Sequence, residues 1–292
     1  MPSHLEPPCA ILPTAGQGTF RILQLTDFHS DKGDGLAEQT YADVRSIVAN
    51  TSPDLLAVTG DIWCCDDDGE RAQAIMQRDL AFLDSLRVPW AFTPGNHDHS
   101  DTIAEALRRS AASFGMAAPM GDDAGNYRVE IQANGVACWD VFFLNSHERS
   151  LTHDDVAWLE RESERLCEAR ARLLPALAYF HIPLEHYETA RLEGRTHGIA
   201  QEEVLYWDDD GTLFDGLRRA GNVRACFVGH SHANDFWFEE DGIVFSYGRA
   251  TGHGGYGADR LQKGATLVEL ELASERFDFQ TVFADGSCWR AV

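Results

Sequence analysis

A regular alternation of short apolar runs and amphipathic segments dominates the first 115 residues. The apolar runs predict buried strands and the amphipathic segments predict helices, in the order strand 20–26, helix 36–50, strand 55–59, helix 71–87, strand 88–93 and helix 102–114. Strands and helices that alternate in this way form a parallel or mixed sheet whose crossover helices cover it. The alternation therefore predicts the α/β class.

The second half of the chain is richer in strands. Patterning predicts one helix at 152–172 and strands at 127–131, 136–145, 176–180, 223–228, 235–238, 243–247, 265–272 and 277–283. Asn134-Gly135 predicts a two-residue hairpin turn, and Thr152 with Asp155 resembles a capping box. Four prolines predict that residues 1–19 are an irregular N-terminal arm. No repeat or linker divides the remainder, so 20–292 is predicted to be a single domain.

Composition excludes several classes of protein. The chain has 292 residues, of which 44% are hydrophobic and 24% charged. These values are ordinary for a globular protein and exclude a disordered chain, a collagen-like repeat and a disulfide-stapled mini-protein. The formal net charge of −23 disfavours long nucleic acid and anionic membranes as partners. A locally positive pocket, such as a metal site, remains compatible with this charge.

The seven cysteines and the first twenty residues bear on the compartment. The cysteines form no C-x-x-C pair, and several lie inside apolar runs. This pattern favours reduced thiols and a cytoplasmic protein. The first twenty residues lack the basic and apolar regions of a signal peptide, so none is expected. No apolar run approaches the roughly 20 residues of a membrane span.

Five polar motifs share one position, directly after a predicted strand. They are Asp27-Phe28-His29, Gly60-Asp61, Gly95-Asn96-His97-Asp98, His181 and Gly229-His230-Ser231-His232. Strand ends at one edge of a sheet converge in space, and α/β proteins build sites there. The glycines before Asp61, Asn96 and His230 are expected to let the chain turn sharply.

The residue types in these motifs favour a pair of metal ions. The candidate ligands are four imidazoles, two carboxylates and one amide: Asp27, His29, Asp61, Asn96, His181, His230 and His232. Imidazole suits Fe, Zn, Mn and Ni, whereas carboxylates suit harder ions. The set exceeds the needs of one ion and is enough for two if one carboxylate bridges them. Two such ions suit an in-line displacement at phosphorus.

Each motif has a simpler interpretation when it is taken alone. D-x-H and G-D occur by chance, and His181 in an apolar run is more often a buried core histidine. G-N-H-D can be a turn closed by an Asx hydrogen bond. Chance turns do not explain all five motifs in this order, each directly after a predicted strand.

The ordered motifs D-x-H, G-D, G-N-H-D, H and G-H-x-H resemble those of the calcineurin-like metallophosphoesterase superfamily. Further similarity lies in LTHDDVAWLERE (151–162), YFHIPLEHY (179–187), GHSHANDF (229–236) and SYGRATGHGGYG (246–257). The last three resemble the purple-acid-phosphatase-like branch, which includes a yeast cell-cycle regulator phosphatase and its plant relatives. The resemblance implies an αββα sandwich of four layers with two mixed β-sheets.

The same resemblance implies roles for the residues of the motifs. Asp27, His29 and His232 would hold one metal ion, Asn96, His181 and His230 would hold the other, and Asp61 would bridge them. The ions would be a combination of Fe, Mn or Zn, with Ni also open. A metal-held hydroxide would attack phosphorus, His97 would contact the phosphoryl group and protonate the leaving group, and Asp98 would orient His97.

The chain departs from purple acid phosphatases at two positions. Cys64 stands where those enzymes carry the tyrosine that ligates ferric iron, and His29 stands where they carry glycine. No purple charge-transfer colour is therefore expected.

Several other residues are candidates for the surroundings of the site. His147, Arg149 and Arg249 are candidate substrate contacts, with a solvated loop as the alternative for the first two. His253 lies in a glycine-rich loop and could approach the metals or close a turn, His99 could support Asp98, and Trp63 could line the pocket or the core. The acidic runs 66–68 and 208–210 are expected to be solvated turns.

These observations predict a dinuclear-metal hydrolase of small phosphate esters, with phosphomonoesters favoured. A small-molecule phosphodiesterase is the first alternative, because the same metal pair serves both reactions. A non-catalytic scaffold on the same fold is the second, and it is disfavoured because every ligand position and His97 are filled.

Overall fold

The structure is a computed structural model that describes residues 9–14, 18–63, 69–98 and 125–291. The expected helix at 102–114, His99, Cys64 and the acidic run 66–68 lie outside the described residues.

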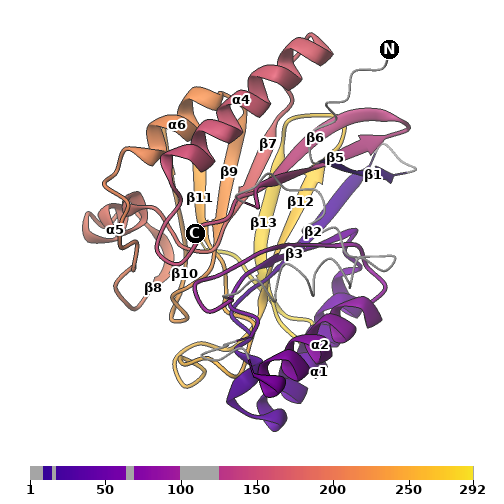
Figure 1. Ribbon diagram of the computed structural model, residues 1–292, viewed down its shortest axis with the longest axis vertical. Helices are drawn as coiled ribbons and strands as arrows, with labels where there is room; N and C mark the ends of the chain where they lie inside the picture. The colour runs from indigo at the N-terminus through magenta and orange to yellow at the C-terminus, as the bar shows by residue number, and fades with distance from the viewer. Residues whose placement is uncertain (1–8, 15–17, 64–68, 99–124, 292) are drawn as a thin grey trace.

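The described chain forms two β-sheets with helices on their outer faces (Figure 1). The first sheet has eight strands in the order β1 (Cys9–Thr14), β5 (Tyr127–Ala133), β6 (Val136–Phe143), β7 (Ala176–Tyr179), β9 (Val223–Val228), β11 (Ile243–Tyr247), β10 (Asn234–Glu240) and β8 (His197–Ala200). The second has six strands in the order β14 (Cys288–Trp289), β13 (Phe277–Val282), β12 (Ala265–Glu271), β2 (Thr19–Leu25), β3 (Leu55–Thr59) and β4 (Trp90–Thr93). Both sheets contain parallel and antiparallel pairs.

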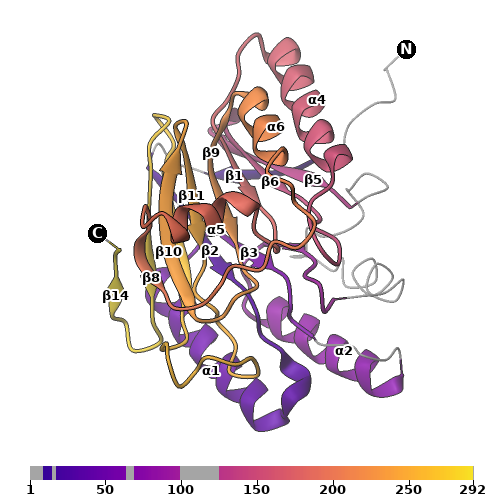
Figure 2. The same ribbon diagram turned by 90° about the vertical axis from the view of Figure 1, so that its left-hand side faces the viewer.

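The helices lie on opposite sides of the paired sheets, as Figure 2 shows. Helices α1 (Asp34–Thr51) and α2 (Glu70–Ser85) cover the second sheet, and a one-turn helix, η1 (Ser30–Lys32), precedes α1. Helices α4 (His153–Arg170), α5 (Glu185–Leu192) and α6 (Leu213–Ala220) cover the first sheet. This arrangement confirms the predicted αββα sandwich with two mixed sheets.

Three apolar cores hold the four layers together, one under each helical layer and one between the sheets. Strand β3 shows why its apolar run is continuous. Leu55 and Ala57 face the core between the sheets, whereas Leu56 and Val58 face the helices α1 and α2. A strand buried on both faces needs apolar residues at every position.

The carboxyl ends of the central strands of both sheets meet at one edge. Strands β2, β3 and β4 are parallel neighbours in the second sheet, and β7 and β9 are parallel neighbours in the first. Gln24 of β2 donates a hydrogen bond to the carbonyl oxygen of Val228 at the end of β9, and Thr93 of β4 donates one to the carbonyl oxygen of Leu144 after β6. The loops after these strands therefore lie close together.

Most predicted elements are present with shifts of one or two residues at their ends. Asn134 and Gly135 have φ of 52° and 78°, as a hairpin turn of the primed type requires. Thr152 and Asp155 form the predicted capping box at the start of α4.

The N-terminal arm differs from the prediction. Residues 1–19 were expected to be irregular, but Cys9–Thr14 forms strand β1 and pairs in parallel with β5. Its sequence is short and contains Pro13, which an edge strand tolerates because one side of its backbone has no partner strand. The elements α5, β8, α6 and β14 were also not predicted.

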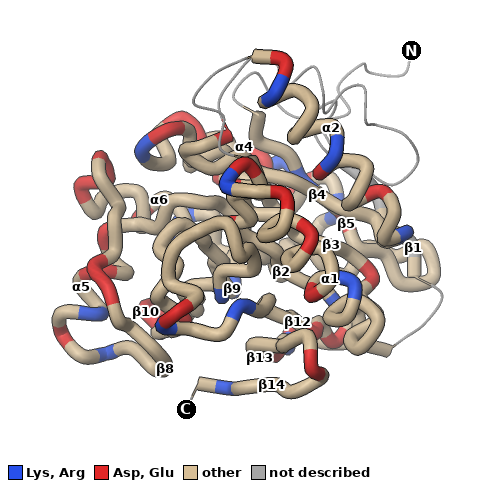
Figure 3. The backbone as a smooth tube through the Cα atoms, turned by 90° about the horizontal axis from the view of Figure 1, so that it is seen from below, with Lys and Arg blue, Asp and Glu red and all other residues tan. Residues whose placement is uncertain are grey.

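The structure places the charged residues and the cysteines that the composition counts. The outer helices of both layers carry acidic positions with basic ones between them (Figure 3). Within the described ranges Cys138, Cys167, Cys226 and Cys288 are free thiols. No helix in the described part of the chain is both long and apolar enough to cross a membrane.

Candidate metal centre

Four of the predicted ligand residues have left-handed backbone conformations. The φ angle is 58° at Asp27, 48° at His29, 53° at Asp61 and 87° at His230. Residues with a side chain adopt such angles rarely, and they cluster where a site requires a particular side-chain direction. Each of these residues lies in a loop that follows a strand, where the left-handed backbone sets the direction of its side chain.

The glycines next to the ligands are needed mainly because a side chain would not fit there, and less because of their backbone freedom. Only Gly60 has a positive φ, 82°, among the three glycines that precede a motif ligand. A Cβ atom on Gly95 would lie 2.2 Å from Oδ1 of Asp61, and one on Gly229 would lie 2.2 Å from Oγ1 of Thr26. The expectation of sharp turns therefore holds for Gly60, whereas close packing explains the other two.

Asp27, His29 and His232 form the first ligand group, whose ligand atoms lie within 4.8 Å of one another. The Nε2 atoms of His29 and His232 are 3.1 Å apart, and Oδ1 of Asp27 lies 3.3 Å from Nε2 of His232. Nδ1 of His232 lies 3.2 Å from the carbonyl oxygen of Tyr256. A carbonyl can only accept, so Nδ1 carries the proton and Nε2 presents its lone pair to the group.

Asp61, His181 and His230 form the second ligand group, also within 4.8 Å. Oδ1 of Asn96 lies 3.2 Å from Nε2 of His181, which places the amide beside this group. Nδ1 of His181 lies 2.8 Å from the carbonyl oxygen of Thr59. Nδ1 of His181 therefore donates its proton to this carbonyl oxygen, and Nε2 is the ring atom that faces the group.

Asp61 connects the two groups. Its Oδ2 lies 3.2 Å from Nε2 of His181 and 3.7 Å from Nε2 of His29. Its Oδ1 accepts a hydrogen bond from the backbone N–H of His97 at 2.9 Å. One carboxylate oxygen thus faces a ligand from each group, which is the position a bridging ligand needs.

The residues fit a pair of metal ions. Nε2 of His230 is buried and has no hydrogen-bond partner within the described residues. A buried polar atom without a partner is costly, and a cation in the second group would satisfy it. Two imidazoles that face each other through Nε2 in the first group would likewise share one cation. Mixed imidazole and carboxylate donors suit Fe, Mn or Zn.

The pKa values of the ligands follow from burial and from one another. Burial would raise the pKa of Asp27 and of Asp61, but the neighbouring imidazoles outweigh it and hold both below the usual range. Burial lowers the pKa of His29 to about 4 and that of His230 to about 3, which keeps both rings neutral at pH 7.

The pKa of His181 shifts in the opposite direction from those of His29 and His230. Burial would lower its pKa, but the Asp61 carboxylate outweighs burial and raises the pKa to about 9. A metal ion that binds Nε2 of His181 must therefore displace a proton.

His97 and Asp98 follow Asn96 in the same turn. The His97 ring lies 5.4 Å from the His29 ring, centroid to centroid, at the side of the first group. The Asp98 carboxylate was expected to orient His97. It accepts hydrogen bonds from four backbone N–H groups, those of Asp61, Ile62, Trp63 and Gly95, at 2.6 to 3.3 Å. Asp98 therefore fastens the loop after β3 to the loop after β4.

Burial and the charge of Asp61 raise the pKa of Asp98 to about 8, although hydrogen bonds from backbone N–H groups oppose that rise.

Several sequence candidates contact residues outside the two ligand groups. Nε2 of His253 lies 2.7 Å from Oδ2 of Asp43 in α1. Nε2 of His147 lies 2.9 Å from Oδ2 of Asp155, the capping-box partner of Thr152 at the start of α4. Trp63 is a core residue that stacks on Phe92.

The two candidate arginines are both paired. Arg249 is buried, donates to Asp235 at 2.6 Å and donates to the carbonyl oxygen of Gln262 at 2.8 Å. Arg149 makes two hydrogen bonds to Asp208, at 2.6 and 2.8 Å. The prediction of solvated turns at 208–210 is wrong for Asp209, whose buried carboxylate accepts from backbone N–H groups.

Two aromatic residues beside the ligands were missed. The Trp207 ring meets the His230 ring edge-on at 4.8 Å, and the Tyr256 ring stacks on the His232 ring at 4.1 Å. Tyr256 lies in the glycine-rich segment 246–257, whose composition was a usable signal for close approach to a ligand. No local pattern distinguishes Trp207, because it reaches the site from an irregular loop.

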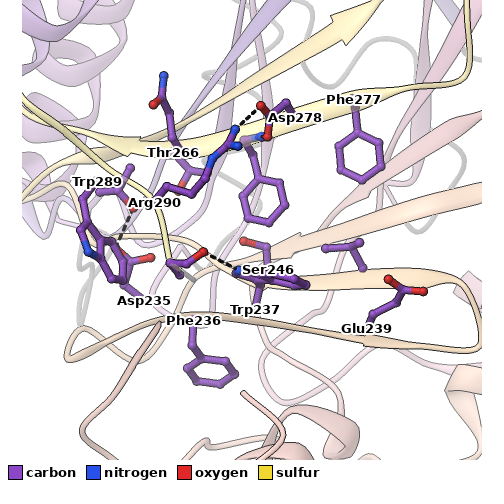
Figure 4. A pocket seen from close by; sticks show the side chains of 15 residues that line it. Asp235, Phe236, Trp237, Glu239, Ser246, Thr266, Phe277, Asp278, Trp289 and Arg290 are labelled. Carbon is purple, nitrogen blue, oxygen red and sulfur yellow. Dashed lines mark hydrogen bonds and ion pairs between the residues drawn. The ribbon is translucent and has the colours of Figure 1, made fainter. Parts of the chain in front are cut away.

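A cavity of about 340 Å³ lies elsewhere, between the two sheets and next to the C-terminal strand. Figure 4 shows Trp237, Phe277, Trp289 and Arg290 around it. None of the seven predicted ligands lines this cavity. It is separate from the two ligand groups and does not contribute to them.

Comparisons with known proteins identify the family and the fold. The sequence profile of the family described as calcineurin-like phosphoesterase matches residues 20–234. The chain is 27% identical to probable inactive purple acid phosphatase 29 of Arabidopsis thaliana, over 89% of this chain and 78% of the relative. It is 26% identical to phosphatase DCR2 of Saccharomyces cerevisiae, over 88% of this chain and 51% of the relative.

Two more distant similarities complete the comparison. The chain is 26% identical to the 3',5'-cyclic adenosine monophosphate phosphodiesterase CpdA of Escherichia coli, over 58% of each chain. A dimetal phosphatase from Danio rerio shares the fold with a TM-score of 0.62 at 13% identity, over 91% of this chain and 96% of that one.

Proposed function

Because the chain belongs to the calcineurin-like phosphoesterase family, we propose that it hydrolyses small phosphate esters at the two ligand groups, with phosphomonoesters as the first candidates. The family assignment makes the chain a metal-dependent phosphoester hydrolase. The position of Asp61, with one oxygen between His181 and His29, is the observation that carries the proposal. It supports two ions close enough to act on one phosphoryl group.

The residues of the chain have separate tasks in this proposal. Asp27, His29 and His232 would hold one ion, Asn96, His181 and His230 the other, and Asp61 would bridge them. Two metal ions held there would neutralise the phosphoryl charge and supply an activated water at neutral pH. The contacts of His232 to Tyr256 and of His181 to Thr59 keep both Nε2 lone pairs directed at the ions. Fe, Mn and Zn all suit this donor set.

His97 is proposed to act on the substrate. Its backbone N–H is held by Asp61, and its ring lies beside His29 at the first group. A protonated imidazole there would contact a phosphoryl oxygen and pass its proton to the leaving oxygen. Asp98 supports this placement indirectly, because its four hydrogen bonds fix the turn that carries His97.

The preference for monoesters rests on similarity to the yeast phosphatase DCR2, since the plant relative is named a probable inactive purple acid phosphatase. A monoester carries more charge than a diester and benefits from cationic groups around its free oxygens. Arg149 is paired with Asp208 and Arg249 with Asp235, so neither candidate arginine is available without breaking an ion pair. This observation favours diesters as the second candidate, as does the similarity to CpdA.

A panel of esters with metal analysis tests the proposal. Protein prepared without chelator should hold about two metal ions per chain, and it should hydrolyse nitrophenyl monoesters faster than bis-nitrophenyl and cyclic diesters. His197, which stacks on Trp237 at the far edge of the first sheet, provides a control histidine. The variant His197→Gln should retain both metals and the activity.

The outcomes separate the alternatives. Faster hydrolysis of diesters would replace the first candidate by the second. Metal-loaded protein that hydrolyses no ester in the panel would overturn the proposal and favour a scaffold. A stoichiometry that stays at one ion after supplementation with Fe, Mn or Zn would exclude the dinuclear centre.

A further inference from the structure

Exposed aromatic side chains gather at the two histidines of the G-H-x-H motif. The exposed large hydrophobic side chains of the described residues include two aromatic ones, Trp207 and Tyr256, which are 37% and 52% exposed. Trp207 contacts the ring of His230 in the second ligand group, and Tyr256 contacts the ring of His232 in the first. Aromatic side chains left in solvent beside a reaction centre are suited to bind a ligand.

The backbone at Trp207 is strained and firmly held. Its φ is 38°, a left-handed value that is an outlier for a bulky residue. The next three residues anchor the loop through their side chains. Asp208 pairs with Arg149, Asp209 accepts from the backbone N–H groups of Glu185 and Gly211, and Asp210 accepts from Thr212. Strain that its surroundings enforce in this way tends to occur at functional positions.

The contacts of the two aromatic residues differ in kind. Tyr256 supports His232 with its ring, its carbonyl oxygen and its hydroxyl group, which also donates to Glu202. Trp207 meets His230 only edge-on, and the Arg149 guanidinium lies 5.7 Å from its ring centroid. The indole N–H of Trp207 makes no hydrogen bond within the described part of the chain. Tyr256 is therefore occupied by its contacts with the ligand residue His232, whereas part of the Trp207 ring remains available for a substrate to contact.

We infer that Trp207 forms a wall of the site for the ester group, and that the preferred substrates carry a flat aromatic ring in that group. This inference rests on the proposed function, because it requires a phosphoryl group bound at the two ligand groups. The substituent on that phosphorus extends past the ligand rings, and the exposed ring beside His230 can stack on a planar substituent. Arg149 stays paired with Asp208, and its guanidinium contacts the Trp207 ring through a cation–π interaction at 5.7 Å.

A matched pair of esters tests this inference. Benzyl phosphate and cyclohexylmethyl phosphate have primary alcohol leaving groups of similar size and basicity, and they differ in the flat ring. Metal-loaded protein should favour the benzyl ester by about 3- to 10-fold in kcat/KM, mainly through KM. If diesters are the better class, the methyl diesters of the same alcohols replace them. The corresponding phosphonates, titrated calorimetrically, report binding without turnover.

Variants assign the preference to Trp207. Trp207→Leu should abolish the benzyl preference in both kcat/KM and phosphonate affinity, and Trp207→Phe should retain most of it. Leu192→Ala removes a side chain that is 70% exposed on α5 and should leave the preference unchanged. Metal content is measured for each variant.

Three results would overturn the inference. They are the absence of a benzyl preference in the wild type, an unchanged preference in Trp207→Leu, and an equal loss of both esters together with metal in that variant. The proposed function would survive each of them if the wild type hydrolyses both esters. Failure to hydrolyse any ester, with a phosphonate preference that depends on Trp207, would overturn the proposed function and support recognition of the ring.

Discussion

The two ligand groups are supported in different ways. In the first group, His232 rests on Tyr256, and a Cβ on Gly255 would lie 2.2 Å from the His232 ring. This support comes from the loop that contains Gly255 and Tyr256, more than 200 residues after Asp27, which we call the late loop. In the second group, His181 is held by the carbonyl oxygen of Thr59 at the end of a core strand. The first group therefore depends on a late loop, whereas the second depends on the strand ends themselves.

This difference has a consequence for metal binding. The ring of His230 contacts His181 and Trp207, and its Nε2 has no partner in the described chain. The second group thus has an unsatisfied ligand that a cation would satisfy. In the first group the ligands already contact one another. Changes in the late loop should affect the first site alone, and changes at the bridge should affect both.

The largest effect is expected for Asp61→Asn, which removes the charge that both groups share. The variant should lose metal from both sites together, because Oδ2 of Asp61 faces ligands of both. Hydrolysis should fall to the level of metal-stripped protein. Elemental analysis alongside His197→Gln measures this, and loss of one ion with full retention of the other would show that Asp61 does not bridge.

The next effect is expected for His97→Ala, which should keep both metals. General acid catalysis contributes about 10²- to 10⁴-fold, so the rate should fall by that range. The loss should be larger for an alkyl ester than for a nitrophenyl ester, whose leaving group needs no proton. Equal losses for both esters would assign His97 to binding or charge stabilisation, and loss of metal would assign it to structure.

The sequence predicted the convergence of the site residues well because that convergence depends on topology. Apolar runs located the strands, and parallel neighbours bring their carboxyl ends together whatever their separation along the chain. The ligand roles of Asn96 and of the six other residues stay predictions that metal analysis tests.

What the sequence did not predict depends on tertiary contacts. The four N–H groups that donate to Asp98 belong to two loops, and no local sequence pattern indicates that these loops meet. Trp207 reaches His230 from an irregular loop, and Arg249 turns out to pair with Asp235. Strand β1 was missed because its stability comes from pairing with β5, which is more than 110 residues away.

A smaller effect concerns the scaffold beneath the first group. Asp79 of α2 is buried, accepts a short hydrogen bond from Tyr41, and lies beside Arg78, which donates to the carbonyl oxygen of Ser30 next to His29. Burial raises the pKa of Asp79 to about 7. The native state therefore holds this proton more tightly than the unfolded chain, and the carboxyl reduces stability as the pH rises from about 4 through 7.

Asp79→Asn should remove that dependence. Relative to wild type, its free energy of unfolding should improve by about 2 to 3 kcal/mol between pH 5 and pH 8. Urea denaturation of both proteins at the two pH values gives this difference, in which titrations common to both cancel. A difference that does not change with pH would mean that Asp79 is ionised throughout.

Gly255→Ala should weaken the first site selectively. The new Cβ would press on the His232 ring, so this ligand must shift, while His181 and His230 keep their contacts. Changes around a metal ligand typically cost about 10- to 100-fold in affinity. Calorimetric titration with Mn²⁺ fitted to two sites should show this loss at one site. An equal loss at both sites would contradict independent support.

The smallest effect is expected for Tyr256→Phe, and it sharpens the comparison most. The change keeps the stacked ring and the carbonyl oxygen that fixes the His232 tautomer, and it removes the hydroxyl that joins the His232 backbone N–H to Glu202. Of the two hydrogen bonds lost, only the neutral one from the His232 N–H touches a ligand residue, and the other goes to the Glu202 carboxylate. A neutral hydrogen bond contributes about 0.5 to 1.5 kcal/mol, so Mn²⁺ affinity should fall by about 10-fold or less. The fall should appear at the first site only, since no contact of Tyr256 reaches His181 or His230 within the described residues.

Trp207→Leu is the matched change on the other histidine and should alter neither affinity, because Trp207 touches its ligand through ring edges alone. If Tyr256→Phe weakened both sites equally, the late loop would support the whole centre and the two groups would not differ as proposed.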